Sequence, residues 1–323
     1  MRKIKYIRRG ICLVLALATL FLASCSVSSR NDEDIEIICT VYPQYDWVKS
    51  IVGEVEGVSV SLLVTGSTDV HGYQPTVDDM IRLCESDAVV LVGGESDAWV
   101  FEALKASQSE AIVLMELEGM TLRGVSDECV ASEHEHEHDY EHYHNDVIDE
   151  HVWLSVANAR TSCKAICEWL CEVDAENAAI YRANTERYVA ELDSLDARFK
   201  KLAQEVDTPV IFADRFPFVY LFEDYGISYY AAFAGCSTDS EASFDTVARL
   251  AERLGETRSR YVAVSETSDK SLAHSVIGAA GVESEIIALD SMQSVTERQI
   301  NDGYGYISAM EENFRALSKM IKE

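Results

Sequence analysis

The stretch ENAAIYRANTERYVAELDSLDARFKKLAQEV, residues 176–206, contains no glycine or proline and spaces its apolar side chains three or four residues apart. That spacing gathers the apolar side chains on one face and predicts a single helix of about 45 Å, at 1.5 Å per residue. A helix of this length in the middle of the chain is expected to join two lobes. Its apolar positions are Ile180, Tyr181, Tyr188, Val189, Leu192, Leu195, Phe199 and Leu202.

Apolar, β-branched runs alternate with amphipathic stretches on both sides of this helix, a pattern typical of βαβ units that build parallel sheets. The expected fold is therefore α/β: two lobes, each with a mostly parallel sheet flanked by helices, joined by one long rigid helix. The expected strands are IEIICTVY, GVSVSLLV, AVVLVGG and AIVLMEL before the helix, and PVIFAD, ISYYAAF, RYVAVSE and SEIIALD after it.

The first residues read as an export signal. Five basic residues precede the apolar run Ile11–Ala23, which is shorter than the roughly 20 residues that cross a bilayer. The sequence Leu-Ala-Ser-Cys ending at Cys25 resembles a bacterial lipobox, so Cys25 is the expected lipid attachment site. The protein is therefore expected to be exported and lipid-anchored at the outer face of the bacterial cytoplasmic membrane, with the membrane contacted only through the anchor.

These features divide the chain into five segments. Residues 1–24 are the expected signal peptide and 25–35 a flexible tether. An N-terminal α/β lobe (36–174), the linking helix (175–206) and a C-terminal α/β lobe (207–323) are expected to follow.

The net charge of −29 would become −34 once the five basic residues of 1–24 are removed. Such an acidic protein is unsuited to nucleic acids or anionic substrates and compatible with cations. Seven cysteines remain after Cys12 and Cys25 are set aside, and an odd number argues against a complete disulfide framework. Cys163, Cys167 and Cys171 recur every four residues, which predicts one stripe of a helix, more consistent with packing than with a zinc knuckle.

The segment EHEHEHDYEHYHNDVIDEH, residues 133–151, holds six of the eight histidines together with eight acidic residues. Imidazole suits zinc, copper, nickel and iron, and interleaved carboxylates favour the approach of a divalent cation. Glu-His alternation cannot form a packed core, so a surface loop over 131–148 is expected, with either weak metal collection or simple solvation as its role. The loop histidines are His134, His136, His138, His142 and His144.

Two further histidines are candidate ligands of a defined site. His71, in LLVTGSTDVHGYQPTVDDM, directly follows an expected strand, and loops at the carboxyl ends of strands bind ligands in α/β folds. His151, in DEHVWLSVANA, leaves the histidine-rich loop and enters expected ordered structure, where Ser155 can cap the following helix. A lone surface histidine is the alternative for His71.

The second lobe has no histidine except His274, which is expected on a helix face away from the cleft, so carboxylates must complete a metal shell. Asp214, Glu266 and Asp290 each directly follow an apolar strand. Two histidines with one or two carboxylates would hold a divalent metal between the lobes. A helix cap or a partner for Arg215 is the competing role for Asp214 and Glu266.

Together these motifs resemble the zinc/manganese solute-binding lipoproteins of ABC importers, the cluster A-I metal-binding proteins, and in particular the zinc branch. The resemblance spans nearly the whole chain after the signal. The pieces that carry it, in order, are TVYPQYDWV, GSTDVHGYQPTVDDM, VVLVGGESDAWV, DEHVWLSVANA, RFPFVYLFEDYGI, GCSTDSEAS and LDSM.

The resemblance implies a protein that captures a divalent metal and delivers it to a membrane permease driven by an ATPase. It implies His71, His151 and Asp290 as ligands. The family's third ligand position falls on Arg215, which cannot bind a cation, so Asp214 is the substitute and Glu266 the reserve. Zn²⁺ is the expected cargo, with Mn²⁺ or iron as alternatives because carboxylate oxygens favour harder ions.

No HExxH, GxSxG or P-loop motif is present, so an enzyme is not expected. A zinc-dependent hydrolase and a surface adhesin or metal buffer are the rival classes. A monomer is expected, partnered by an ABC permease and its ATPase.

Overall fold

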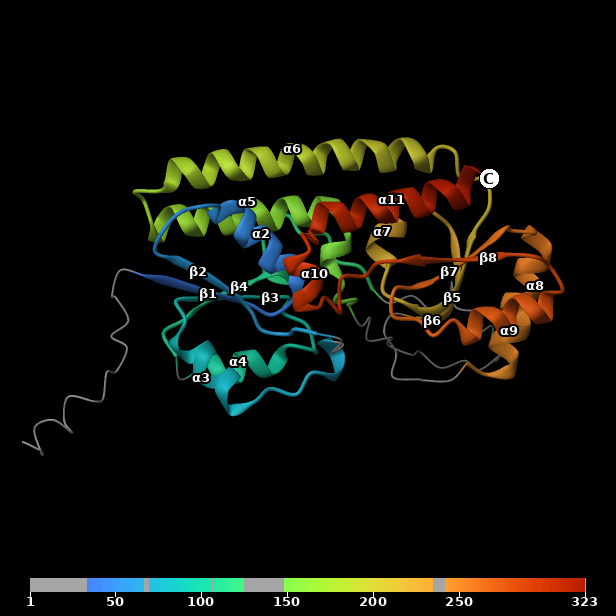
Figure 1. The fold of residues 1–323 in the computed structure, drawn as a ribbon, viewed down its shortest axis with the longest axis horizontal. Helices are drawn as coiled ribbons and strands as arrows, with labels where there is room; N and C mark the ends of the chain where they lie inside the picture. The colour runs from blue at the N-terminus through green and yellow to red at the C-terminus, as the bar shows by residue number, and fades with distance from the viewer. Residues whose placement is uncertain (1–33, 67–69, 106, 125–147, 235–241, 323) are drawn as a thin grey trace, which may run out of the picture. The chain divides into compact units, whose positions relative to one another are not determined.

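The computed structural model describes residues 34–66, 70–105, 107–124, 148–234 and 242–322 (Figure 1). The expected signal peptide, Cys25 and the five loop histidines lie outside these residues. Two four-stranded sheets belong to Ile35–Glu323, which forms one unit. In the part of the chain that the structure describes, no helix is both long and apolar enough to span a bilayer.

The first sheet has the strand order β2-β1-β3-β4 and is parallel throughout. Ile37 in the inner strand β1 pairs with Val60 on one side and Ala88 on the other. All four residues of β3 are buried, which explains their uninterrupted apolar sequence. The strands are β1 (Ile35–Cys39), β2 (Val58–Leu62), β3 (Ala88–Leu91) and β4 (Glu110–Val113).

The second sheet repeats this arrangement with the order β6-β5-β7-β8, again all parallel. Phe212 in β5 pairs with Ala231 and Ala263, and the register shifts between Phe212 and Arg215. The eight predicted strands and the α/β class are thus confirmed. The strands are β5 (Val210–Phe216), β6 (Tyr229–Ala234), β7 (Tyr261–Ser265) and β8 (Glu285–Leu289).

Helices follow the strands of both sheets. Thr76 and Ser155 cap α3 and α5 by accepting backbone hydrogen bonds from Asp79 and Asn158, and the cap by Ser155 was predicted. The α-helices are α2 (Tyr42–Val52), α3 (Val77–Glu85), α4 (Ala98–Leu104), α5 (Val156–Val173), α6 (Ala178–Ala203), α7 (Val219–Asp224), α8 (Phe244–Thr257), α9 (Ser271–Ala280), α10 (Glu297–Asn301) and α11 (Tyr306–Lys322). Short 3₁₀ turns are η1 (Val70–Gly72), η2 (Leu114–Glu116) and η3 (Val152–Leu154).

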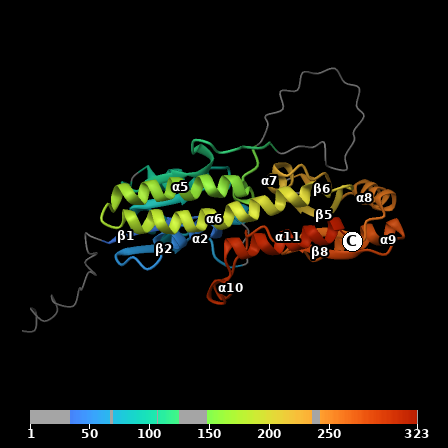
Figure 2. The ribbon, with the colours of Figure 1, turned by 90° about the horizontal axis from the view of Figure 1, so that it is seen from above.

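The linking helix is α6, which is slightly shorter than the predicted 176–206. It packs against α5, α2 and α11, and Figures 1 and 2 show α5, α6 and α11 side by side. Tyr181, Leu192 and Phe199 lie on its buried face, so most of the predicted apolar stripe faces its neighbours. Ile180, which was assigned to that stripe, is instead 47% exposed. Lys200 and Lys201 occupy its last turn, where positive charge stabilises the helix dipole.

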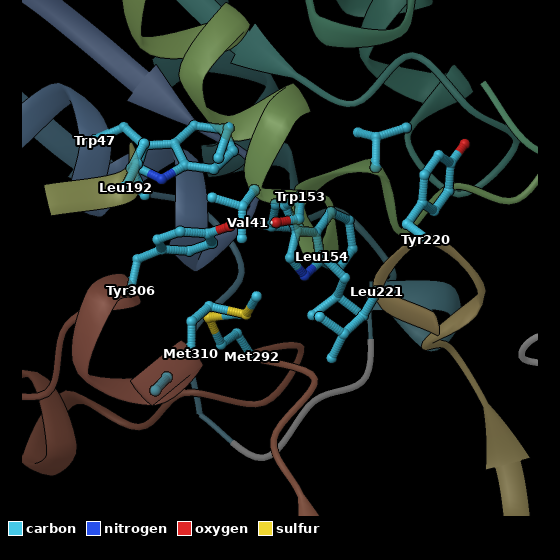
Figure 3. Packing of buried hydrophobic residues seen from close by; sticks show 14 of the residues in the cluster. Val41, Trp47, Trp153, Leu154, Leu192, Tyr220, Leu221, Met292, Tyr306 and Met310 are labelled. Atoms are coloured by element: carbon cyan, nitrogen blue, oxygen red, sulfur yellow. Dashed lines mark hydrogen bonds between the residues drawn. The ribbon is translucent and has the colours of Figure 1, made fainter. Parts of the chain in front are cut away.

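The lobes share one apolar core in addition to α6. That core contains Ile37 and Val90 of the first sheet together with Phe212 and Ala263 of the second. After β8 the chain returns to the first lobe, where the Tyr306 ring lies edge-on to Trp47 at 5.2 Å (Figure 3). The Tyr306 hydroxyl donates to the Trp153 carbonyl at 2.6 Å. A second connection therefore reinforces the linking helix.

We expect Gly93→Ala to destabilise the fold strongly. Gly93 has φ +94° and a Cβ there would lie 2.3 Å from Val113 Cγ1, so both strain and overlap oppose a side chain. Left-handed backbone strain costs about 1–3 kcal/mol, and the overlap adds to it. Gly303→Ala is the matched control, because Gly303 has φ +88° with nothing within 4 Å. Urea unfolding should give the larger loss for Gly93→Ala; equal losses would contradict the packing argument.

Candidate metal centre

His71 lies in η1, in the loop that follows β2. The solvent-exposed fraction of its side chain is 25%. Its Nδ1 lies 2.6 Å from the Ser96 hydroxyl, which belongs to the loop between β3 and α4. Two strand-end loops of the first sheet thus meet at His71, as expected for a ligand site in an α/β fold.

His151 directly precedes η3 and is buried, with 2% of its surface exposed. Asp149 makes two contacts with His151. The Asp149 Oδ1 atom accepts a hydrogen bond from the His151 backbone N–H at 2.9 Å and lies 2.8 Å from His151 Nδ1. The Trp153 ring packs edge-on against the imidazole at 5.2 Å. A carboxylate accepts at Nδ1, so the arrangement favours a His151 tautomer whose Nε2 carries the lone pair.

The two histidines face each other through their Nε2 atoms, which are the atoms available to bind a metal. His71 Nε2 and His151 Nε2 are 3.2 Å apart, and the rings are tilted by 59°. Two nitrogens bound tetrahedrally to one zinc ion at 2.0–2.1 Å would be about 3.3 Å apart. The observed separation therefore suits a shared ion with little rearrangement.

The Ser96 hydroxyl allows His71 to change tautomer. Without a metal, His71 Nε2–H can donate to His151 Nε2, and Nδ1 then accepts from the hydroxyl. With a metal on Nε2, the proton resides on Nδ1 and the hydroxyl oxygen accepts it. A serine hydroxyl rotates between these roles, so one contact orients the ring in both states.

Glu150 fixes the loop that carries Ser96. Its carboxylate accepts the backbone N–H of Glu95 and that of Ser96, the latter at 3.0 Å. A Cβ on Gly94 would lie 2.4 Å from the Glu150 side chain, so glycine permits this close approach. The tripeptide Asp149-Glu150-His151 thus positions both imidazoles, one directly and one through Ser96.

Asp290, the predicted ligand of the second lobe, follows β8. Its Oδ2 accepts from the Tyr304 hydroxyl at 2.7 Å and its Oδ1 from the Met292 N–H at 2.9 Å. Met292 has φ +61°, a strained value for a non-glycine residue that is maintained in this turn. Burial raises the pKa of the Asp290 carboxyl.

Glu266 follows β7 and lies near Asp290. Its two oxygens accept from the Ser291 N–H and hydroxyl at 2.9 and 2.7 Å. Burial, and then the charge of Asp290, raise the pKa of Glu266 to about 7. Because the charge of Asp290 opposes the ionisation of Glu266, a cation beside the two carboxylates would stabilise them.

Asp214 is placed differently. Its Oδ1 accepts the Arg215 N–H at 2.8 Å and its Oδ2 the Ser265 N–H at 3.4 Å. The Ser265 hydroxyl in turn donates to the Arg215 carbonyl at 3.2 Å. These contacts join the ends of β5 and β7, a structural role that competes with metal ligation. His274 is exposed on α9.

The imidazole pair and the carboxylate pair form two half-sites. Over the described residues, no group of three or more His, Cys, Asp or Glu side chains is close enough to hold one ion. The halves are connected through Trp153, whose indole N–H donates to the Ser291 carbonyl at 2.9 Å. His151 and Asp290 are thus each within two residues of this hydrogen bond.

The base of the histidine-rich segment lies against the second lobe. Gly124 and Ile148 form an antiparallel bridge at its two ends. The Tyr220 hydroxyl of α7 accepts the Arg123 N–H at 3.1 Å and donates to the Asp149 carbonyl at 2.8 Å. Arg123 also pairs with Asp224 at 2.5 Å, so α7 contacts both ends of the base.

The supporting residues were not identified from the sequence. Asp149 and Glu150 directly precede His151 in the sequence, and carboxylates beside a candidate ligand could have indicated their supporting role. Ser96 and Tyr304 are far from the histidines in sequence or belong to the other lobe, and no local pattern indicates them.

The fold and half-sites define a two-lobed α/β protein with imidazoles from one lobe and carboxylates from the other. Residues 37–320 match the family model described as "Zinc-uptake complex component A periplasmic", and the chain belongs to this family. It is 29% identical over 316 residues to the high-affinity zinc uptake system protein ZnuA of Bacillus subtilis (strain 168), covering 95% of this chain and 96% of that one.

The chain is also 28% identical over 307 residues to the zinc-binding lipoprotein AdcA of Streptococcus pneumoniae (strain ATCC BAA-255 / R6). That match covers 95% of this chain but 60% of AdcA, so the chain spans well under the full length of this relative. The Zn(II)-bound ZnuA-like domain of Streptococcus pneumoniae AdcA has the same fold, with a TM-score of 0.70 at 24% identity, over 90% of this chain and 100% of that domain.

In the metal-free protein we expect His151 to carry its proton on Nδ1, because the Asp149 carboxylate accepts there. Long-range ¹H–¹⁵N correlation in mildly alkaline buffer distinguishes the two tautomers. The exposed His274 is the internal control and should show the mixture of an unconstrained imidazole. A predominantly Nε2–H signal for His151 would show that Asp149 does not set the tautomer.

Proposed function

We propose that this protein is an extracytoplasmic solute-binding protein that captures zinc and delivers it to an ABC permease. The observation that carries the proposal is the 3.2 Å separation of His71 Nε2 and His151 Nε2, which suits two ligands of one tetrahedral ion. Membership of a zinc-uptake family and likeness to proteins named for zinc binding and zinc uptake support it.

The proposed ligands are His71, His151 and Asp290, with Glu266 as a fourth donor. Glu266 replaces Asp214 as the stronger candidate, because Asp214 joins β5 to β7 while Glu266 lies beside Asp290. Capture requires the carboxylate half-site to approach the imidazoles. A modest movement about the Trp153–Ser291 contact, which biases the population towards a closed form, is the proposed consequence of binding.

Zinc is proposed over manganese and iron because two imidazoles already face each other, and nitrogen donors suit zinc. If both carboxylates dominate the shell, manganese becomes the better cargo, since oxygen donors suit harder ions. His134, His136, His138, His142 and His144 are proposed to collect metal weakly for this site.

Cys25 is proposed as the lipid anchor, with residues 1–24 as the signal peptide and 25–35 as the tether. The proposed divisions for the remainder stay 36–174, 175–206 and 207–323. The family description as periplasmic and the naming of AdcA as a lipoprotein support export. An ABC permease and its ATPase are the proposed partners, and transport rather than catalysis is the proposed role, in accord with the family of uptake components.

Replacing both histidines tests the proposal. In His71→Ala/His151→Ala we expect zinc affinity to fall by more than about 100-fold, because even a lost outer-shell partner costs roughly 10- to 100-fold. His274→Ala, at an exposed position of α9, should bind like the parent. Equilibrium dialysis with zinc and manganese in competition measures both affinity and preference. Unchanged affinity in the double variant would refute the site, and manganese preference would refute the cargo.

Three amide variants identify the carboxylate ligands. Asp290→Asn and Glu266→Gln should each lower zinc affinity by about 10-fold or more, because a neutral amide loses the charge that attracts the ion. Asp214→Asn is the matched control and should stay within about threefold of the parent. Isothermal titration with a competing chelator provides the measurement. A larger loss for Asp214→Asn than for Asp290→Asn would reverse the assignment.

A further inference from the structure

A cavity of about 390 Å³ lies between α5 and α6, two helices that pack against each other. Cys167 and Cys171, one helical turn apart on α5, both line it. Cys167 is buried and Cys171 is half-buried, with its thiol 3.6 Å from the Ala178 carbonyl at the start of α6. The sequence predicted a buried stripe of three thiols; Cys163 and Cys167 fit that prediction, whereas Cys171 is accessible from the cavity.

The spacing of the two thiols disfavours a disulfide. Residues four apart in a helix have Cβ atoms about 5–6 Å apart, whereas a disulfide needs about 3.5–4.5 Å. Both cysteines are free, and α5 is helical from Val156 to Val173. A single atom bonded to both sulfurs at about 2.3 Å spans the larger gap without distorting the helix.

The number of thiols selects the kind of ion. Structural zinc takes four ligands, and the described residues contain no cluster of three or more metal-binding side chains. Thiolates favour soft ions such as Cu(I), which is stable with two sulfur ligands. Two thiols alone therefore suit a soft monovalent cation better than zinc.

The cavity rim has the charges that such a complex needs. Glu168, Glu172 and Glu186 are exposed there and attract a cation. A monovalent cation bound by two thiolates forms a complex with one net negative charge. Lys164 and Arg182, which also line the cavity, can balance that charge. Burial and the neighbouring Cys167 raise the pKa of Cys171, while Arg182 lowers it, so Arg182 favours the thiolate form.

We propose that Cys167 and Cys171 bind one soft monovalent cation of the cuprous class as a two-coordinate bis-thiolate in the cavity between α5 and α6. Two thiols and one Cu(I) give one S–Cu–S complex and release two protons, and copper keeps its oxidation state. This site is separate from the proposed zinc site in both residues and chemistry, and does not depend on it.

The test titrates the full anaerobic protein with Cu(I) against a chromogenic Cu(I) chelator. We expect Cys167→Ser and Cys171→Ser each to lose one tight equivalent, with affinity lowered by more than about 100-fold. Cys84→Ser, an exposed cysteine on α3, and His71→Ala/His151→Ala should retain it. Retention by either cavity variant, or loss in the histidine variant, would overturn the proposal.

Thiol protection supplies an independent measurement on the unmutated protein. Trypsin cleavage after Lys164 and Arg182 yields peptide 165–182, which contains Cys167 and Cys171 and no other cysteine. Bound Cu(I) should protect this peptide from an alkylating reagent while Cys84 continues to react. Equal alkylation of peptide 165–182 with and without Cu(I) would exclude the site, whatever the folding of the variants.

Discussion

The hydrogen bond from the Trp153 indole to the Ser291 carbonyl is the contact on which the candidate centre depends. Trp153 is two residues from His151 and packs against its ring, while Ser291 adjoins Asp290 and donates to Glu266. The carbonyl of Trp153 accepts a hydrogen bond from the Tyr306 hydroxyl, and Tyr304, two residues earlier, donates to Asp290. One buried side chain therefore sets the relation between the nitrogen donors of one lobe and the oxygen donors of the other. A lost donor here would leave a buried carbonyl without its partner, at about 1–3 kcal/mol.

Within the first lobe, three consecutive residues of different chemistry act together. Asp149 fixes the tautomer of His151, and Glu150 fixes the backbone that carries Ser96 and hence His71. Because both imidazoles are oriented before a metal arrives, little conformational entropy remains to be lost on binding. The second lobe supplies charge instead: the charge of Asp290 opposes the ionisation of Glu266, and a bound cation would offset that repulsion.

The sequence sufficed for the fold because its signals are local. The eight β-branched runs predict the eight strands, and the three- and four-residue spacing in the stretch ending at Val206 predicts α6. The start of α2 was missed, since TVY continues a β-branched run and only Pro43 indicates the helix. His71, His151 and Asp290 could be proposed from strand ends and family resemblance, but Ser96, Tyr304 and Ser291 could not. Their roles arise from hydrogen bonds between residues far apart in sequence, which no periodicity encodes.

Tyr220 of α7 contacts both the base of the histidine-rich segment and the residue that orients His151. Its hydroxyl bonds at once to the main chain of Arg123 and to that of Asp149, so α7 bears on the loop base and on the residue that orients His151. Because the Asp149 carboxylate orients His151, a shift of α7 would move the main chain that holds this imidazole. Conversely, a change at the loop base would reach the buried side of α7 along the same two contacts.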